Sequence, residues 1–265
     1  MFVLIRVLHE ADEDLQEEWV EDLPICDEYF EDDTVKIPSP VRTHHRTWNK
    51  YAYDSIYCTS YEIPYDEDEK AWQNRQRIRP KGGSYASYWR DVYFALYETN
   101  APSIQFIEDS LREIARQNNL SKSDLAKMTV SFVQDIPYEY ILPGDCDVSD
   151  FPCRDHEKFG ILGPVEFLFS LSGDCDTRSV LLYTLLKNMG YSPLIVISKE
   201  YQHAMIALDI PSVGDYLEYR GRRFYFWETT NTGWLPGMLP PGSDNVNYWE
   251  ISLDYEYTPF HSGTD

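Results

Sequence analysis

The sequence predicts an α+β fold in which several helices precede an antiparallel sheet and one further helix packs on it. Three observations indicate this arrangement. Four segments between residues 67 and 136 have helical patterning, "CDTRSVLLYTLLKNMG" forms another very apolar helix, and three short strand-like runs follow it. A chain of 265 residues with 43% hydrophobic content can also bury one principal core.

Acidic side chains dominate the composition and exclude several classes of partner. The formal net charge is -22, from 45 acidic and 23 basic residues, which repels phosphate backbones and anionic lipids. We therefore expect no nucleic-acid partner. No apolar run reaches the length of a membrane span, and the first residues turn acidic too quickly for a signal peptide. The expectation is a soluble chain without membrane insertion, cytoplasmic by default, whose oligomeric state stays open.

Much of the unbalanced charge lies in the first region, residues 1–35. Thirteen acidic residues fall between Glu10 and Asp33, with no Lys or Arg among them. A block of this kind is typical of a solvated, poorly ordered tail. A tail that binds calcium or a partner is the alternative.

Residues 36–100 form an aromatic-rich region that we expect to pack on the domain formed by residues 101–265. Its text "SIYCTSYEIP" alternates as a half-buried strand does, and helices are predicted over residues 67–77 and 85–98. Its Tyr and Trp side chains either belong to the core, which is the more common case, or line a substrate groove.

The domain over residues 101–265 begins with two amphipathic helices, "SIQFIEDSLREIARQN" and "SKSDLAKMTVSFVQDI". Ser121 is expected to cap the second helix, with Asp124 three positions later. The connection over residues 137–164 is rich in Pro and Gly, and a long loop inside a compact domain is usually functional. The helix from Cys175 and the strands "PLIVIS", "HAMIALDI" and "RFYFWE" complete the domain.

The tetrapeptide "GDCD" occurs twice, at residues 144–147 and 173–176, and raises the question of which cysteine is reactive. A cysteine attacks as its thiolate, which the first turn of a helix favours through unpaired backbone N–H groups and the helix dipole. Only Cys175 has this position. Its thiol is therefore expected to titrate below the ~8.5 of an ordinary cysteine.

Cys146, in the first copy, is expected to lie in a loop, because Pro143 and Pro152 leave no room for a helix. It pairs with Cys153 if the environment is oxidising. A zinc site made of Cys146, Cys153 and His156 lacks a fourth ligand at a recognisable spacing. We therefore expect neither a metal nor another cofactor.

A nucleophilic cysteine needs a base and an acceptor that orients the base. His203 opens the strand "HAMIALDI", and Glu228 ends the run "RFYFWE". If the two strands pair antiparallel with His203 opposite Glu228, Met205 faces Phe226 and the imidazole lies beside the carboxylate. A carboxylate after such an apolar run is costly to bury without a partner.

The order of these residues resembles that of the transglutaminase-like superfamily, above all its bacterial members, whose fold is related to papain-like cysteine proteases. The matching text is "SGDCDTRSVLLYTLLKNMGY", "QHAMIAL" and "FYFWETTNTGW", and the resemblance covers residues 104–237. It implies a papain-like core with Cys175 as nucleophile, His203 as general base and acid, and Glu228 as orienting carboxylate. Many members carry Asp at the third position, and the longer Glu side chain still reaches an imidazole.

The text "VSFVQDIPYEY" is similar to the helix that precedes the nucleophile in this superfamily. The resemblance implies that the Gln134 amide donates to the oxyanion, with the backbone N–H of Cys175 as the second donor. An exposed Gln134 at the helix end is the alternative.

Together these residues predict a cysteine-dependent amide or peptide hydrolase that forms a thioester acyl-enzyme. Its substrate would be a peptide, a protein or a cell-wall amide. A protein-glutamine transamidase of the same fold is the first alternative. A catalytically silent binding or scaffold module is the second, with the acidic tail and the aromatic region as its interaction surfaces.

Overall fold

The computed structural model describes residues 40–49, 56–146 and 151–259. The acidic segment over residues 1–35 lies outside these ranges, so its disorder stays a prediction. The described residues all belong to one unit of the chain.

A β-hairpin and four helices come first. They are β1 (Val41–Asn49), β2 (Ile56–Pro64), α1 (Tyr65–Arg77), α2 (Tyr85–Asn100), α3 (Gln105–Gln117) and α4 (Lys122–Gln134). The predicted strand and all four predicted helices are confirmed, and Ser121 caps α4 by accepting from the Asp124 backbone N–H at 3.1 Å.

Two more helices and a sheet follow. They are β3 (Tyr140–Ile141), β4 (Cys153–Arg154), α5 (Pro164–Ser170), α6 (Cys175–Asn188), β5 (Leu194–Ser198), β6 (His203–Leu208), β7 (Tyr216–Tyr219), β8 (Arg222–Trp227) and β9 (Glu250–Leu253). The last five strands form one antiparallel sheet in the order β7-β8-β6-β5-β9. The α+β class with an antiparallel sheet is thus confirmed.

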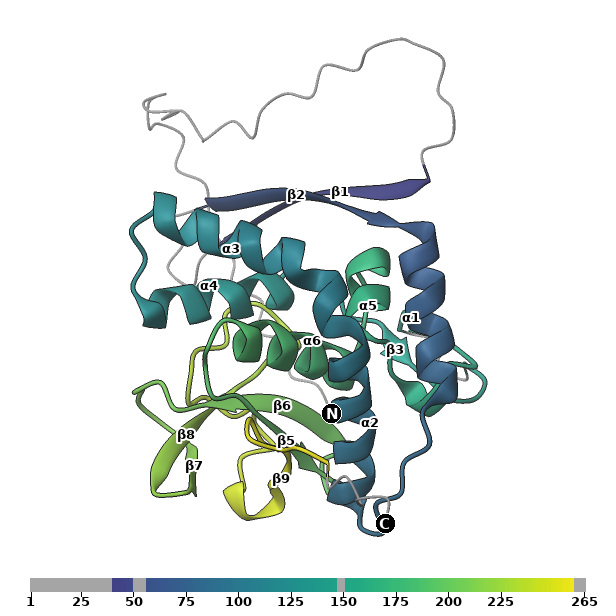
Figure 1. Cartoon of the computed structure of the whole chain (residues 1–265). Coiled ribbons are helices and arrows are strands. Elements are labelled where there is room, and N and C mark those ends of the chain that lie inside the picture. Colours follow the sequence, from purple (N-terminus) through teal and green to yellow (C-terminus); the bar gives the residue numbers. More distant parts are fainter. Residues whose placement is uncertain (1–39, 50–55, 147–150, 260–265) are drawn as a thin grey trace, which may run out of the picture. The chain divides into compact units, whose positions relative to one another are not determined.

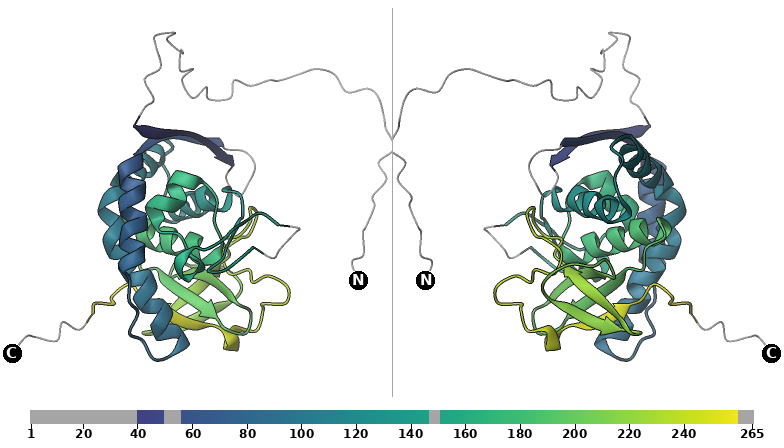
Figure 2. Two further views of the ribbon diagram at one scale, coloured as in Figure 1. Left: turned by 90° about the vertical axis from the view of Figure 1, so that its right-hand side faces the viewer. Right: turned by 90° about the vertical axis from the view of Figure 1, so that its left-hand side faces the viewer.

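The elements are arranged in layers, with the helices between the β1–β2 hairpin and the five-stranded sheet (Figure 1). Helix α6 lies directly on the sheet, and α2 runs down one side to strand β9, as the side views also show (Figure 2). None of the helices in the described ranges is long and apolar enough to cross a membrane.

Apolar side chains bury both faces of the sheet. Leu181 and Leu182 of α6 share a core cluster with Ile206 of β6, and the hairpin aromatics Trp48 and Tyr57 belong to the same cluster. These two aromatic side chains are thus core residues. The opposite face of the sheet packs against Leu239 and Trp249 of the long connection before β9. A sheet that is packed on both faces holds the ends of its strands in fixed positions. Side chains at those ends are therefore held in fixed positions as well.

The predicted pairing of His203 with Glu228 was wrong by two residues. Strands β6 and β8 pair Ala207 with Phe226 and Ile206 with Trp227, so that Glu228 falls just beyond the end of β8. Because side chains alternate with a period of two, a shift by two residues leaves every side chain on its predicted face. His203 and Glu228 therefore stay neighbours on one face.

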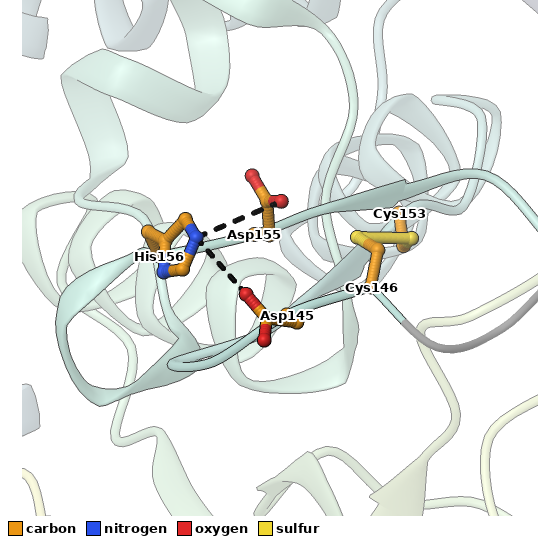
Figure 3. Close-up of a disulfide and its surroundings, with 5 residues drawn as sticks. All are labelled: Asp145, Cys146, Cys153, Asp155 and His156. Atoms are coloured by element: carbon orange, nitrogen blue, oxygen red, sulfur yellow. Dashed lines mark ion pairs between the residues drawn. A yellow bond between two sulfur atoms is a disulfide. The ribbon is translucent and has the colours of Figure 1, made fainter.

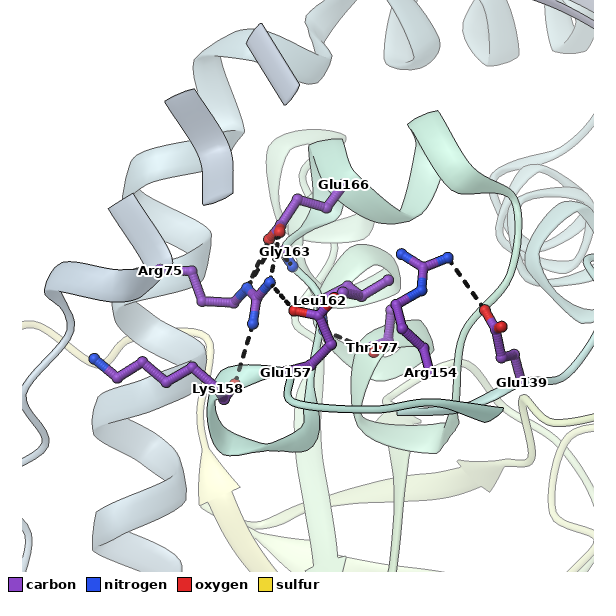
Figure 4. Close-up of polar contacts among 9 residues, drawn as sticks. All are labelled: Arg75, Glu139, Arg154, Glu157, Lys158, Leu162, Gly163, Glu166 and Thr177. Carbon is purple, nitrogen blue, oxygen red and sulfur yellow. Dashed lines mark hydrogen bonds and ion pairs between the residues drawn. The ribbon is translucent and has the colours of Figure 1, made fainter. Parts of the chain in front are cut away.

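Helix α1 is fixed to α5 by a buried arginine, as Figure 4 shows. The guanidinium of Arg75 is fully buried and binds the carboxylate of Glu166 through two nitrogens, at 2.9 Å from Nε and 2.8 Å from Nη2. Glu157 adds a second ion pair at 2.5 Å. The hydrogen bonds and ion pairs of Glu166 and Glu157 hold the pKa of Arg75 above its usual value, although burial, the largest influence, lowers it.

Candidate active site

Cys175 is the first residue of α6, as predicted, and the preceding residues explain why a helix can start there. The Asp174 carboxylate caps the helix by accepting from the backbone N–H of Thr177 at 3.1 Å. Gly173 permits a close approach, because a Cβ at this position would lie 2.8 Å from the Thr177 side chain and 3.0 Å from the Phe167 ring. At Gly144, in the first copy of the tetrapeptide, a Cβ would meet nothing within 4 Å. The two copies therefore differ in structure as well as in position.

The imidazole and the carboxylate predicted to pair are in contact. Nε2 of His203 lies 2.8 Å from Oε2 of Glu228. A carboxylate can only accept, so Nε2 carries the hydrogen, and Nδ1 is the nitrogen left for another partner. Within the described part of the chain no hydrogen bond reaches Nδ1. This is the tautomer that a thiol-activating imidazole needs.

Glu228 is held as a buried acceptor. Its other oxygen, Oε1, accepts from the backbone N–H groups of Thr229 and Thr230 at 2.8 and 2.9 Å and from the Thr230 hydroxyl at 2.8 Å. Burial, the largest single influence, raises the pKa of Glu228, but the contacts with His203 and Thr230 together outweigh it and the pKa is lowered. Glu228 is thus an ionised carboxylate whose position is fixed from three sides.

The thiol lies beside the residue that follows His203. The backbone N–H of Ala204 interacts with the Cys175 thiol. The thiol itself is directed to the Asp176 carboxylate, with 3.6 Å between Sγ and Oδ2. Among the described residues, Cys175 makes no hydrogen bond to His203. The residue next to His203 in the chain thus contacts the thiol, while the thiol itself is bonded to Asp176.

The surroundings of Cys175 are acidic, which the sequence-based expectation for its pKa left out. Only 6% of Cys175 is exposed. Burial, then Asp176 and Asp174, raise the pKa of this thiol well above its usual range. Burial also raises the pKa values of both carboxyl groups. The expectation of an acidic thiol was therefore wrong, because burial and the two neighbouring carboxyl groups outweigh the helix N-terminus.

Replacing Asp176 by Asn should make the thiol more reactive at neutral pH. The variant loses one negative charge beside Cys175 and keeps an oxygen that accepts from the Tyr93 hydroxyl. Because the pKa of the thiol is lower in the variant, alkylation by iodoacetamide near pH 7 should be about tenfold faster. In the wild type the rate should keep rising with pH in the alkaline range, because burial and the neighbouring carboxyl groups raise the pKa of the thiol. The control is Asp155→Asn, and equal rates for both variants would contradict a role of Asp176.

Gln134 has a different role from the one that the resemblance implies. It is the last residue of α4 and only 3% exposed, so the alternative of an exposed helix end does not hold. Its amide nitrogen donates to the carbonyl oxygens of Glu228 and Trp234, at 2.7 and 3.2 Å. These bonds use both N–H groups. Gln134 therefore fixes the backbone of Glu228, and no amide hydrogen is left for an oxyanion.

Tyr138 contacts Cys175 and was not among the residues expected at the site. Its hydroxyl interacts with the backbone N–H of Cys175, and burial, followed by the charges of Cys175 and Asp174, raises its pKa. The phenol is therefore protonated at neutral pH and can donate. The sequence signal was present, since "PYEY" directly follows the helix of Gln134.

Cys146 and Cys153 form a disulfide, so neither sulfur is available as a metal ligand (Figure 3). His156 instead contacts the carboxylate of Asp145 at 3.2 Å. In the described ranges no group of three or more His, Cys, Asp or Glu could hold a metal ion. The described residues contain one free thiol, that of Cys175.

The disulfide belongs to the loop that carries Tyr138. Strand β3 pairs with β4 next to the disulfide, matching Tyr140 with Cys153. The same loop is joined to the segment before α6, because Glu139 accepts from Arg154 at 3.2 Å and from Ser172 at 2.5 Å. The disulfide thus supports one wall of the site.

Removing this disulfide should destabilise the protein moderately. Closing so short a loop is worth about 2 to 3 kcal/mol in the entropic treatment of the unfolded chain. A double variant, Cys146→Ser with Cys153→Ser, should therefore lose about that much free energy of unfolding in urea. The difference in stability between the wild type and the double variant should disappear when a reducing agent is added, because reduction opens the same bond in the wild type. Equal stability of the wild type with and without reductant would contradict this role.

An open pocket of about 530 Å³ is lined in part by Trp249, the ring that contacts His203. Trp249 forms one of its walls and packs edge-on against His203, with 5.8 Å between ring centroids. The other walls are polar or aromatic: Lys199, Glu200, Asn247, Tyr248 and Glu250.

Comparison with models of known protein families, with curated proteins and with solved structures gives no match. The class of chemistry is therefore read from the groups themselves. They are a thiol at a helix N-terminus, an imidazole–carboxylate pair next to it, and two hydrogen-bond donors close to the sulfur. Such groups can carry out nucleophilic acyl transfer.

Proposed function

We propose that this protein is a cysteine-dependent acyl-transfer enzyme with a papain-like or transglutaminase-like core, acting as an amide or peptide hydrolase. Cys175 is the nucleophile, His203 the general base and acid, and Glu228 the carboxylate that orients the imidazole. A peptide, a protein or a cell-wall amide is the substrate class. Water is the acceptor, because it is always present and no lysine-binding feature stands out in the sequence.

In the first half-reaction, Nδ1 of His203 takes the thiol proton and the sulfur of Cys175 attacks the amide carbon. The C–S bond forms, and the carbonyl electron pair moves to oxygen, where Tyr138 and the backbone N–H of Cys175 donate hydrogen bonds. When the C–N bond breaks, His203 returns its proton to the leaving amine. In the second half-reaction His203 takes a proton from water, the C–O bond forms and the C–S bond breaks, which releases the acid and the thiol.

One observation carries this proposal, the contact of 2.8 Å between His203 and the buried carboxylate of Glu228 at the strand end next to Cys175. A buried carboxylate with four donors around it is costly to assemble for packing alone. The contact leaves Nδ1 as the imidazole nitrogen that can accept a proton from a thiol. The contact supports the proposal on chemical grounds, because an imidazole and a carboxylate together make an effective base.

The test is acylation of the folded protein by 4-nitrophenyl acetate. The wild type should release one equivalent of nitrophenolate in a burst and carry an acetyl thioester at Cys175, seen by peptide mass spectrometry. Cys175→Ala should give no burst, and His203→Ala should slow it by about 10²-fold or more. A screen of peptide and peptidoglycan fragments would then define the amide that is cleaved. The absence of a burst from the folded wild type would exclude the proposed enzyme.

The alternative of a catalytically silent binding module is favoured by a specific observation. Cys175 is almost completely buried and has carboxylates on both sides, which raise the pKa of its thiol. A silent module would show no burst, and its thiol would be alkylated at an appreciable rate only after unfolding. The acylation experiment therefore separates the two functions.

A further inference from the structure

Arg178 lies one turn after Cys175 in α6, and its side chain is fully buried. Its guanidinium makes hydrogen bonds only to backbone carbonyl oxygens. Nε donates to Gly173 at 3.0 Å, Nη1 donates to Val133 at 2.8 Å and to Thr229 at 3.1 Å, and Nη2 donates to Ile136. No carboxylate of the described residues forms an ion pair with it. Burial lowers the pKa of Arg178 to about 10, so the group is still charged at neutral pH.

The four carbonyls belong to three separate segments, and each segment carries one part of the site. Gly173 directly precedes the Asp174–Cys175 start of α6. Thr229 is the residue after Glu228, and Val133 and Ile136 belong to the end of α4 and the turn before Tyr138. One planar group thus fixes the distances among the nucleophile, the imidazole–carboxylate pair and the oxyanion donor. A lysine could not replace it, because its ammonium lacks the rigid fork of five N–H donors.

The comparison with Arg75 shows that this arrangement is more than ordinary burial of an arginine. Both guanidinium groups are fully buried, but Arg75 is neutralised by Glu166 and Glu157 and joins α1 to α5. Burying a charge without a paired carboxylate is costly, and an apolar side chain of similar volume would fill the space at lower cost. The free-energy cost of burying the Arg178 charge is explained if the site requires the arrangement of backbone carbonyls that this guanidinium holds.

We propose that Arg178 is a positioning residue of the acyl-transfer site, which aligns Cys175 with the His203–Glu228 pair by holding the chain segments that carry them. This inference rests on the proposed function and adds a residue to it. Arg178 touches no reacting atom, and its effect acts through the carbonyls of Gly173 and Thr229. The electrostatic influence of Asp174, Cys175 and Glu228 on Arg178 places the guanidinium close to all three.

A double-mutant cycle tests alignment separately from stability. The rate of Cys175 alkylation by iodoacetamide near pH 8 is measured for the wild type, His203→Ala, Arg178→Lys and the double variant, with folding checked by circular dichroism. In the wild-type background, His203→Ala should slow alkylation by about tenfold or more. In the Arg178→Lys background, His203→Ala should slow alkylation of Cys175 by less than about twofold, because the imidazole is no longer aligned with the thiol.

Arg75→Lys supplies the matched control, since it also removes a buried guanidinium fork. It should lower stability as Arg178→Lys does, yet leave the tenfold effect of His203→Ala intact. An undiminished effect of His203→Ala in the Arg178→Lys background would overturn the positioning role while leaving the proposed function standing. If His203→Ala had no effect in the wild-type background, both the proposed function and this inference would fail.

A measurement on the unchanged protein covers the case in which Arg178→Lys does not fold. With arginine labelled selectively with ¹⁵N, the Nε resonance of Arg178 should shift when iodoacetamide alkylates Cys175, because Nε binds the carbonyl of Gly173 next to the site. The Nε resonance of Arg75 should not shift. A resonance of Arg178 that stays unchanged on alkylation would contradict the coupling.

Discussion

Glu228→Gln should lower the rate of Cys175 acylation by about 10³- to 10⁴-fold while leaving the fold intact. The amide has one oxygen, and three donors from Thr229 and Thr230 converge on Oε1. That oxygen must therefore stay where Oε1 is, which turns the amide NH₂ toward His203. The imidazole then has to accept at Nε2 and carry its hydrogen at Nδ1, the tautomer that cannot take a proton from the thiol.

The measurement is the burst of nitrophenolate from 4-nitrophenyl acetate, compared for Glu228→Gln, the wild type and the control Glu98→Gln, whose side chain is exposed on α2. All three should fold, with Glu228→Gln unfolding at a lower temperature than the other two because it lacks the stabilising carboxylate. A Glu228→Gln variant with wild-type acylation would show that the imidazole is oriented by another group.

The dependence of stability on pH gives a second readout for Glu228. Its pKa is lowered in the folded protein, so its carboxylate stabilises the fold above the unfolded pKa of about 4.3, and this contribution is lost as pH falls through the folded pKa. Glu228→Gln has no such group. The stability difference between wild type and variant should therefore shrink in acid, and a constant difference down to about pH 2 would contradict the lowered pKa.

Arg75→Gln should cost about 3 to 5 kcal/mol of unfolding free energy, the largest stability effect that we expect from one exchange outside the site. The variant leaves the buried carboxylate of Glu166 without the fork that binds it, and Glu157 loses its ion pair as well. Urea denaturation measures the loss. The control Arg77→Gln changes an exposed arginine of the same helix and should cost less than about 0.5 kcal/mol. Equal losses for the two variants would mean that α1 is not held through Arg75.

Many of the helices and strands could be predicted from local sequence patterns. The apolar spacing of α6, the cap at Ser121 and the alternation of β2, β6 and β8 are properties of short segments, so their positions could be predicted without tertiary information. Helix α5 and the strands β1, β3, β4, β7 and β9 were missed. They are short or half exposed, or depend on partners distant in sequence, as β9 depends on β5.

The sequence alone also indicated the candidate site residues. The repeated tetrapeptide, with prolines around one copy and an apolar helix after the other, separated Cys175 from Cys146. The parity of strand positions put His203 and Glu228 on one face even though the assumed register was wrong by two residues.

Only the tertiary structure decided the properties that depend on neighbours far along the chain. Burial and the carboxylates of Asp174 and Asp176 set the pKa of Cys175, the backbone of Glu228 takes both N–H groups of Gln134, and the carbonyls of three segments meet at Arg178. Electrostatic and hydrogen-bond energies depend on distance in space, which a linear pattern does not contain. Spacing along the chain therefore predicted the candidate site residues. The tertiary structure fixed the charge, the hydrogen bonds and the orientation of each side chain.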